Sequence, residues 1–242
     1  MKKILVIGES CRDIFVYCDA NRLCPDVPVP VLNIKDQTEN GGMAKNVQRN
    51  IQSHIADCDL VTNSDWHNIT KTRYMHTHSN HMFLRVDTPH IIDGINITTI
   101  DFDYEIIVIS DYNKGFLSEQ DIEFICKNHN NVFLDTKKIL GPWANNAKYI
   151  KINHYEYTNS LPHITPELSS KIIHTMGADG CEFQNKQYGV NKVDVKDTSG
   201  AGDSFMAALV VEYYKNHNIH DSIKFANKCA SQIVKKKGVS VI

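Results

Sequence analysis

Short runs of apolar residues recur along the chain and predict the strands of a parallel β-sheet. Together they are rich in Ile and Val, and each ends in small or polar residues. They cover 4–8, 106–110, 132–135, 149–153 and 172–177. Short runs without regular alternation are typical of strands that are buried on both faces.

Helical patterns fit between several of these runs. Over 117–128, apolar side chains stand at Ile122, Phe124 and Ile125, and Ser118 precedes acidic residues that suit the start of a helix. A strand followed by a helix, repeated along the chain, predicts an α/β fold with a doubly wound, mostly parallel sheet.

Three other segments alternate apolar and polar residues, which is the period of half-exposed antiparallel strands. They are 27–35, 81–87 and 95–101, and the prolines at 28 and 30 would keep the first of them at a sheet edge. We expect these strands to form a small antiparallel β-sheet that lies as a lid over the large sheet.

The pattern predicts a single domain over 1–242, with a lid that is discontinuous in sequence and comes from about 12–39 and 72–101. The 242 residues, of which 42% are hydrophobic, suffice for a sizeable core. No internal repeat or low-complexity tract divides the chain.

Charge and cysteine content narrow the class of protein. The formal net charge is -2, and the one basic block, at 235–237, suits a helix end, so we expect no nucleic-acid partner. The seven cysteines form no CxxC pair, which favours reduced thiols. The first apolar run is too short for a signal peptide, and no stretch has the length of a membrane span. We expect a cytoplasmic protein without a membrane partner.

The segment 197–209, DTSGAGDSFMAAL, carries the densest chemical signal. Gly200 and Gly202 would let the backbone turn sharply near a ligand, and an apolar helix follows from about Ser204 to Tyr214. Free N–H groups at a helix start bind anions, and Asp203 could accept a proton from a hydroxyl beside that anion. Phosphoryl transfer needs both devices. The alternative is an ordinary helix cap whose Asp suits the dipole.

This loop resembles the C-terminal signature of the ribokinase-type (PfkB) carbohydrate kinases. The matching positions are Asp197, Thr198, Gly200, Ala201, Gly202, Asp203 and the pair Ala207 and Ala208. The first signature of that family resembles NGGMAKN, with Gly41, Gly42 and Asn46 in place. The two signatures occur in the expected order, so the resemblance implies a ribokinase-like fold and an ATP-dependent kinase.

Further stretches narrow the resemblance to the heptose 7-phosphate kinases. They are CPDVPVPVL, DYNKG, ITKTRY with LRVD, VFLDTK and the final FANKCASQIVKKKGVSV. That similarity implies phosphorylation of the anomeric hydroxyl of D-glycero-D-manno-heptose 7-phosphate. Bifunctional members carry a nucleotidyltransferase domain after the kinase, and we expect this chain to end before one.

The resemblance assigns roles in catalysis and sugar binding. Asp203 matches the catalytic base, and the amides of Gly200, Ala201 and Gly202 match the anion hole. The residues that match sugar-contacting positions are Asp13, Gly41, Gly42 and Asn46. A phosphorylated sugar also needs cations, and the candidates in family-like stretches are Arg73, Arg85 and Lys114. Singly, each of these charged residues is more often solvated, and GG followed by Asn is otherwise a turn.

For the nucleotide, the NHYE stretch resembles the NxxE motif of the family. Asn153 and Glu156 would help to hold Mg²⁺ and phosphate, with Glu156 as the metal residue, because Mg²⁺ needs few carboxylates. The other positions that match the nucleotide side are Thr175, Gly177, Gly180, Asp197 and Asn227. Lone glycines would otherwise form a hairpin turn, and Asn227 would otherwise be an ordinary helix residue.

Two further expectations come from relatives. Asp197 and the loop 238–240 would lie beside a site for a monovalent cation such as K⁺. The small sheet would pair with a second copy of the chain, giving a homodimer through the β lid.

His76, His78 and His81 invite a metal hypothesis. On a strand, His76 and His78 would share one face and His81 the other, and zinc needs more ligands than these. We therefore favour a substrate-facing sheet edge over a metal site.

The chain also departs from the family. Segments 50–72 and 157–170 are short, and Lys45 replaces a small residue, which leaves the acceptor and the ATP affinity open. Two alternatives to a heptose 7-phosphate kinase therefore remain. One is a kinase for another sugar, sugar phosphate or nucleoside, and the other is a non-catalytic sugar-phosphate or nucleotide sensor.

Overall fold

The computed structural model describes residues 2–79, 81–236, 238 and 241–242. Its large sheet has eight strands in the order β12-β11-β10-β9-β8-β7-β1-β4. The strands are β1 (Lys2–Gly8), β4 (Cys58–Val61), β7 (Tyr104–Asp111), β8 (Val132–Thr136), β9 (Tyr149–Asn153), β10 (Ile172–Thr175), β11 (Cys181–Phe183) and β12 (Lys186–Tyr188). In this sheet β10, β9, β8, β7, β1 and β4 run parallel. The strands β11 and β12 add an antiparallel edge next to β10.

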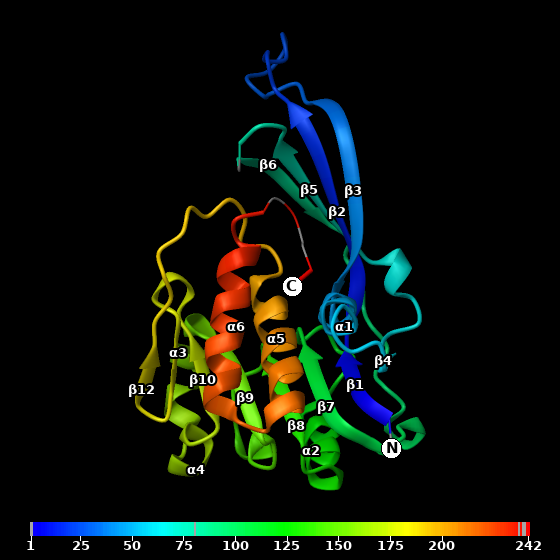
Figure 1. Ribbon diagram of the computed structural model, residues 1–242. Helices are drawn as coiled ribbons and strands as arrows, with labels where there is room; N and C mark the ends of the chain where they lie inside the picture. The colour runs from blue at the N-terminus through cyan, green and yellow to red at the C-terminus, as the bar shows by residue number, and fades with distance from the viewer. Residues whose placement is uncertain (1, 80, 237, 239–240) are drawn as a thin grey trace.

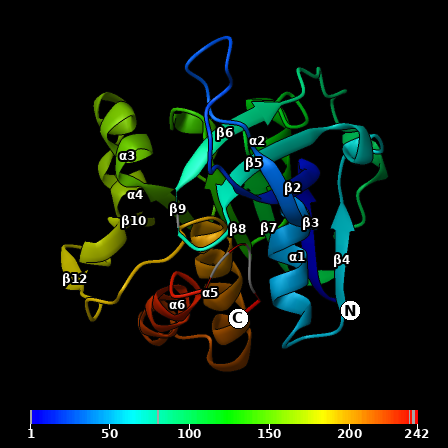
Figure 2. The same ribbon diagram turned by 90° about the horizontal axis from the view of Figure 1, so that it is seen from above.

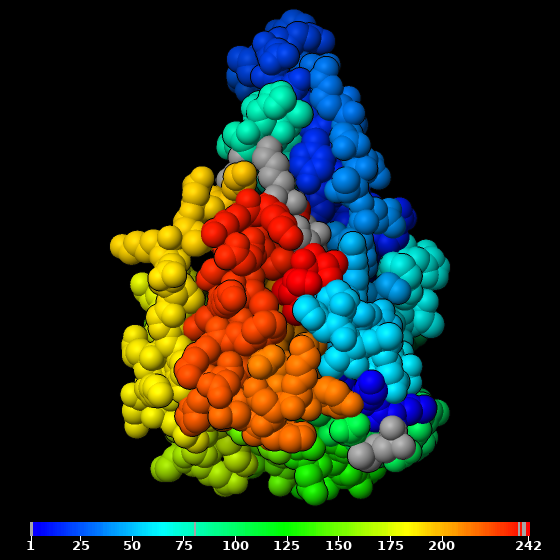
Figure 3. All heavy atoms as spheres, in the orientation of Figure 1, coloured from blue at the N-terminus to red at the C-terminus, as the bar shows by residue number. Residues whose placement is uncertain are grey.

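Helices cover both faces of the large sheet (Figures 1 and 2). They are α1 (Ala44–Gln52), α2 (Glu119–Asn128), α3 (His154–Ser160), α4 (Pro166–Ser169), α5 (Ala201–Asn216) and α6 (Ile219–Ile233). In Figure 3 the atoms of α5 and α6, orange to red, cover the face turned toward the viewer. Alternate residues of a strand face opposite sides, so Ile4 and Val6 pack with α1, α5 and α6, whereas Leu5 and Ile7 pack on the side of α2. The two hydrophobic cores lie on these two faces. No helix in the described part of the chain is both long and apolar enough to span a membrane.

A separate small sheet stands beyond the carboxyl end of β1 (Figures 1 and 2). Its order is β3-β2-β5-β6, from β2 (Ser10–Asp19), β3 (Asn33–Met43), β5 (Thr70–His76) and β6 (Met82–Asp87). Only Glu9 separates β1 from β2, so the chain passes directly from one sheet into the other. The β2–β5 pair is parallel, so this sheet is mixed, whereas we expected an antiparallel one.

The structure contains all five predicted parallel strands and the helix over 119–128, which Ser118 caps through a capping box with Asp121. The predicted strand over 95–101 is wrong: Ile97–Thr99 form a 3₁₀ turn, because the Asn96 side chain accepts the Thr98 N–H and favours a local turn.

Two predicted boundaries also shift. The strand expected over 27–35 begins only at Asn33, beyond both prolines, and continues to Met43. Helix α5 begins at Ala201 rather than Ser204, because Gly200 takes the left-handed conformation (φ 75°) that precedes the first turn. Between α1 and β5 the chain forms only β4 and a short 3₁₀ turn, Trp66–Asn68.

Candidate active site

The carboxylate of Asp203 lies buried in the first turn of α5, where it meets side chains from α1 and from the end of β7. Its Oδ1 accepts a 2.6 Å hydrogen bond from the Tyr112 hydroxyl, and its Oδ2 accepts one of 2.8 Å from Asn46 Nδ2. Asn46 is itself held by Asn50, whose amide donates to the Asn46 carbonyl groups. Three elements that are distant in sequence therefore position one carboxylate.

Burial and hydrogen bonding act in opposite directions on this carboxylate. Burial raises the pKa of Asp203 above its ordinary value, while the donors from Asn46 and Tyr112 lower it, and the net direction is upward. A carboxylate that is buried, hydrogen-bonded and raised in pKa is suited to accept a proton.

The turn before α5 presents backbone N–H groups beside Asp203. The Ser204 N–H makes the first helical hydrogen bond, to Gly200 O at 2.9 Å, so the N–H groups of Gly202 and Asp203 precede the helical ladder. The Ala201 N–H donates to Thr198 O at 3.2 Å. The turn therefore has the geometry of a helix start that can bind an anion, and the Gly202 N–H is a freer donor than the Ala201 N–H.

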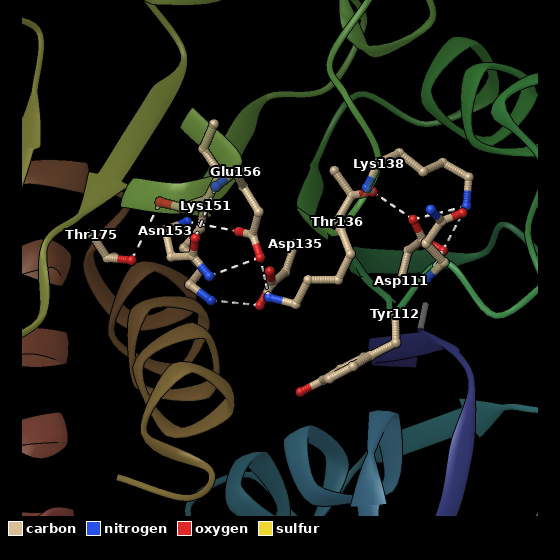
Figure 4. Close-up of polar contacts among 12 residues, drawn as sticks. Asp111, Tyr112, Asp135, Thr136, Lys138, Lys151, Asn153, Glu156 and Thr175 are labelled. Atoms are coloured by element: carbon tan, nitrogen blue, oxygen red, sulfur yellow. Dashed lines mark hydrogen bonds and ion pairs between the residues drawn. The ribbon is translucent and has the colours of Figure 1, made fainter. Parts of the chain in front are cut away.

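A buried ion pair that sequence reasoning missed lies against this turn. Lys151 of β9 and Asp135 of β8 are neighbours across the two strands, and their side chains pair at 2.7 Å (Figure 4). A side chain added at Gly202 would meet Lys151 Nζ at 3.0 Å. The other oxygen of Asp135 has no hydrogen-bond partner among the described residues. The signal in the sequence was a lysine inside the buried run YIKIN.

On the sugar side, three of the expected residues, Asp13, Arg73 and Arg85, lie on one face of the small sheet. Asp13 of β2 pairs with Arg73 of β5 at 3.1 Å, and Arg73 stands opposite Arg85 of β6. Arg85 in turn pairs with Asp87 at 2.7 Å. Asp13 and Arg73 are mostly buried, so the cations are ordered by carboxylates rather than spread over the solvent face.

Gly41 and Gly42 lie near the end of β3, just before Met43 and the start of α1. A side chain at Gly42 would meet Cys11 Sγ at 3.0 Å and Asp13 Cβ at 3.2 Å, so any larger residue would be crowded against Asp13. Lys114 is exposed, and its backbone N–H donates to the buried Glu9. The structure therefore brings Asp13, Gly42 and Arg73 together, whereas the Lys114 side chain stays at the surface.

On the nucleotide side, Asn153 and Glu156 form a capping box at the start of α3. Glu156 accepts hydrogen bonds of 2.8 Å from the Asn153 backbone and side-chain N–H groups. Lys137, which follows β8, pairs with Glu156 at 2.5 Å. Figure 4 shows that Glu156, Asp135 and Lys151 lie close together at the ends of β8 and β9. The NxxE motif thus builds the helix start and also faces a cation.

The glycines after β10 shape a tight turn into β11. Gly177 and Gly180 have positive φ angles of 58° and 82°, and a side chain at Gly180 would meet Tyr188 O at 2.1 Å. The Thr175 hydroxyl donates to Ile152 O at 3.3 Å. Thr175 lies opposite Asn153 across β10 and β9, so the turn that holds the two glycines begins beside the NxxE helix start.

The remaining nucleotide-side candidates make structural contacts. The amide of Asn227, buried in α6, donates to Tyr188 O at 2.8 Å. Asp197 accepts the Ser199 N–H at 2.8 Å and the Gly238 N–H at 3.0 Å. Of the predicted cation loop 238–240, residues 239 and 240 lie outside the described residues.

The histidine cluster gives no metal site. His76 ends β5, its Nδ1 accepts the Ser79 N–H, and His81 packs edge-on against Phe83. Among the described residues, no group of three or more His, Cys, Asp or Glu side chains could hold a metal ion.

Comparison with known proteins finds a family model that matches the C-terminal part of the chain and relatives that match nearly all of it. Residues 124–241 match the model of the pfkB family carbohydrate kinases. The chain is similar to the bifunctional protein HldE of Helicobacter pylori strain G27, with 26% identity over 298 aligned positions that include 98% of this chain. It is also similar to HldE of Hydrogenovibrio crunogenus, with 25% identity and 99% of this chain aligned. The chain spans 64% and 61% of the lengths of these relatives.

Solved structures show the fold. A ribokinase from Thermotoga maritima superposes with a TM-score of 0.72 at 17% identity, over 99% of this chain and 95% of that one. Phosphofructokinase-2 from Escherichia coli in complex with potassium gives a TM-score of 0.71 at 14% identity, over 100% and 95% of the two chains. The chain therefore has the ribokinase-like α/β fold.

Proposed function

Since residues 124–241 match the model of the pfkB family carbohydrate kinases, we propose that the protein transfers the γ-phosphoryl group of ATP to a hydroxyl of a phosphorylated sugar. The observation that carries this proposal is the buried Asp203 in the first turn of α5, next to backbone N–H groups that suit an anion. A base and an anion-binding helix start in contact are the two devices that this reaction needs.

In the proposed step, the Asp203 carboxylate accepts the proton of the attacking sugar hydroxyl. The sugar oxygen bonds to the γ-phosphorus, and the bond from that phosphorus to the bridging oxygen of ADP breaks. The N–H groups of Gly202 and Asp203 would bind the oxygens of the transferred group. The ammonium of Lys151 lies against Gly202 and would add positive charge at the same place.

For the acceptor, we propose D-glycero-D-manno-heptose 7-phosphate, phosphorylated at its anomeric hydroxyl. The similarity to HldE over nearly the whole chain supports this substrate, and so does the facing pair Arg73 and Arg85. In this proposal Asp13 binds sugar hydroxyls, while Arg73, Arg85 and Lys114 bind the phosphate that the sugar already carries. Asn46 would act mainly through Asp203, because its amide donates to that carboxylate.

For the nucleotide, we propose that Glu156 holds Mg²⁺, partly through water. The carboxylate of Glu156 is buried and already pairs with the Lys137 ammonium. A buried carboxylate in such a position is suited to have a cation such as Mg²⁺ near it. Mg²⁺ would supply charge neutralisation for the phosphate oxygens. Thr175, Gly177 and Gly180 would line the phosphates, with Asn227 on the adenine side. Asp197 would lie near K⁺.

We also propose a homodimer through the small sheet. Its exposed apolar side chains include Ile34, Met82, Leu84 and Val86, and a sheet with such a surface is suited to cover it with a second copy.

The test is ADP release by the purified protein with MgATP and four acceptors: the heptose 7-phosphate, ribose, fructose 6-phosphate and adenosine. Turnover confined to the heptose phosphate would support the proposal. A preference for ribose or adenosine would overturn the assignment of the arginines. Thermal stabilisation by ligands with no ADP release from any acceptor would favour a non-catalytic sensor instead.

A further inference from the structure

Tyr112 links Glu9, which lies between β1 and β2, to the carboxylate of Asp203. It follows the last residue of β7, and its N–H donates to the buried Glu9 Oε2 at 2.8 Å. Its hydroxyl donates to Asp203 Oδ1 at 2.6 Å. The ammonium groups of Lys71 and Lys137 lie 5.2 and 5.5 Å from its ring centroid. The phenol is thus fixed at its backbone, along its ring and at its hydroxyl.

This hydrogen bond ends at the group that would accept the substrate proton. An ionised carboxylate has about four sites for hydrogen bonds. Tyr112 and Asn46 occupy one site on each oxygen of Asp203, so each oxygen keeps a site for a sugar hydroxyl. The Tyr112 hydroxyl can therefore stay in place while the carboxylate takes up a proton.

The other charged and titratable groups around Asp203 come from four elements and the segment after one of them. They are Cys11 of β2, Lys71 of β5, Asp135 of β8, Lys137 after β8 and Lys151 of β9. Asp135 disfavours a second negative charge at Asp203, whereas Lys151 favours it. Of the groups that face Asp203, only Tyr112 and Asn46 have a hydrogen bond to its carboxylate among the described residues.

We propose that Tyr112 is a positioning residue for catalysis, whose hydroxyl fixes the orientation of the Asp203 carboxylate and keeps it ionised for proton uptake. This inference rests on the proposed function. A hydrogen bond donated to an anion favours the anion, so removal of the hydroxyl raises the pKa of Asp203 further. A base with a higher pKa is protonated over a wider acidic range, which moves the acidic limb of the rate profile to higher pH.

The first experiment measures Asp203 directly, without turnover. The ¹³C signal of its carboxyl group is assigned by its loss in Asp203→Asn and is followed against pH in the ligand-free protein. Tyr112→Phe keeps the ring and should shift the titration to higher pH. The matched control is Tyr104→Phe, which removes a 2.6 Å hydrogen bond to Asp59 at the other end of β7. That control should leave the Asp203 titration unchanged.

A second substitution keeps the inference testable if Tyr112→Phe does not fold. Incorporation of 3,5-difluorotyrosine at position 112 makes the phenol a stronger donor while the shape of the side chain changes little. It should move the Asp203 titration to lower pH. The same titration in all three forms would overturn the role of Tyr112.

The kinetic experiment then separates this inference from the proposed function. In Tyr112→Phe, kcat/KM should fall by roughly tenfold at the acidic end and recover toward the wild-type value at alkaline pH. A loss of kcat/KM that is equal at every pH would show a merely structural role and contradict the inference. If the wild-type protein releases no ADP with any acceptor, the proposed function fails, and the carboxyl titration still decides the role of Tyr112.

Discussion

At the scale of the residue, the site depends on charges that the fold buries and pairs. Asp203 has two neutral donors, whereas Asp135 has the ammonium of Lys151. A buried carboxylate that loses its partner strongly destabilises the fold. The partners of Asp203 and Asp135 therefore contribute to stability as well as to the geometry of the candidate site. In the proposed site, Lys151 couples stability to catalysis, because its ammonium pairs with Asp135 and lies where a side chain at Gly202 would meet it.

The first prediction concerns Lys151. Lys151→Met should lower the free energy of unfolding by about 3–5 kcal/mol, because Asp135 stays buried without a cation. Adding Asp135→Leu should restore most of that loss in urea unfolding, while ADP release stays low because the charge beside Gly202 is gone. Lys148→Met serves as the control, because the Lys148 ammonium donates to the neutral Asn131 side chain. Wild-type turnover in the double variant would contradict this role.

The second prediction concerns the phosphate of the sugar. Arg85→Gln should raise the KM for the sugar phosphate by roughly ten- to a hundredfold, through loss of charge-assisted hydrogen bonds, and leave the KM for MgATP nearly unchanged. Arg12→Gln is the matched control, since Arg12 pairs with Glu39 on the opposite face of the small sheet from Asp13. Equal effects of the two substitutions would refute the phosphate site.

The loop that carries Asp203 could be selected from the sequence as a candidate site, whereas the ion pairs around it could not. Asp203 stands in a dense local motif, so a few neighbouring residues indicate its role. Lys151 meets Asp135 only because β8 and β9 pair in parallel with these two residues in register. The sequence contains no local signal of that register. The Tyr112 contact also needs β7 and α5 to meet, although the two residues are far apart in the chain.

At the scale of the element, the buried parallel strands were the most predictable part of the fold. These strands are buried on both faces, so most of their residues are apolar. Such a run can be recognised from the local sequence alone. The segment 95–101 alternates like a strand, yet the Asn96 side chain closes a 3₁₀ turn there, so local hydrogen bonding overrides the pattern. The start of α5 was misplaced because the left-handed Gly200 allows the helix to begin at once.

The third prediction concerns the turn between β10 and β11. Gly180→Ala should lower the free energy of unfolding by about 2–4 kcal/mol, since φ is 82° and the new Cβ would meet Tyr188 O at 2.1 Å. It should also weaken MgATP binding, because the turn lies beside the NxxE helix start. Gly189→Ala is the control, since nothing lies within 4 Å of its added Cβ. A Gly180→Ala protein as stable as that control in urea would contradict this account of the turn.

At the scale of the whole molecule, the two sheets carry different groups of candidate residues. The large sheet carries Asp135, Lys151 and the start of α3 at the carboxyl ends of its strands, and the small sheet carries Asp13, Arg73 and Arg85. The direct passage from β1 through Glu9 into β2 joins them. The position of Asp203 between these groups supports the proposed transfer between a nucleotide and a sugar phosphate.

The fourth prediction concerns assembly. If the small sheet pairs with a second copy, Leu84→Glu should convert a dimer into a monomer in light scattering, because Leu84 of β6 is 53% exposed in the single chain. Leu161→Glu, at a residue that is 50% exposed but lies in the 3₁₀ turn after α3, should leave the dimer intact. A wild-type monomer would reject the proposed dimer.

The most direct test of the central claim is ADP release by Asp203→Asn, compared with the wild-type protein under saturating MgATP and sugar phosphate. The matched control is Asp59→Asn, whose carboxylate accepts a 2.6 Å hydrogen bond from a tyrosine at the opposite end of the sheet. We predict that kcat falls by roughly 10²–10⁴-fold in Asp203→Asn and by little in the control, while both proteins fold and bind MgATP. An Asp203→Asn protein that turns over within about threefold of wild type would show that Asp203 is not the base.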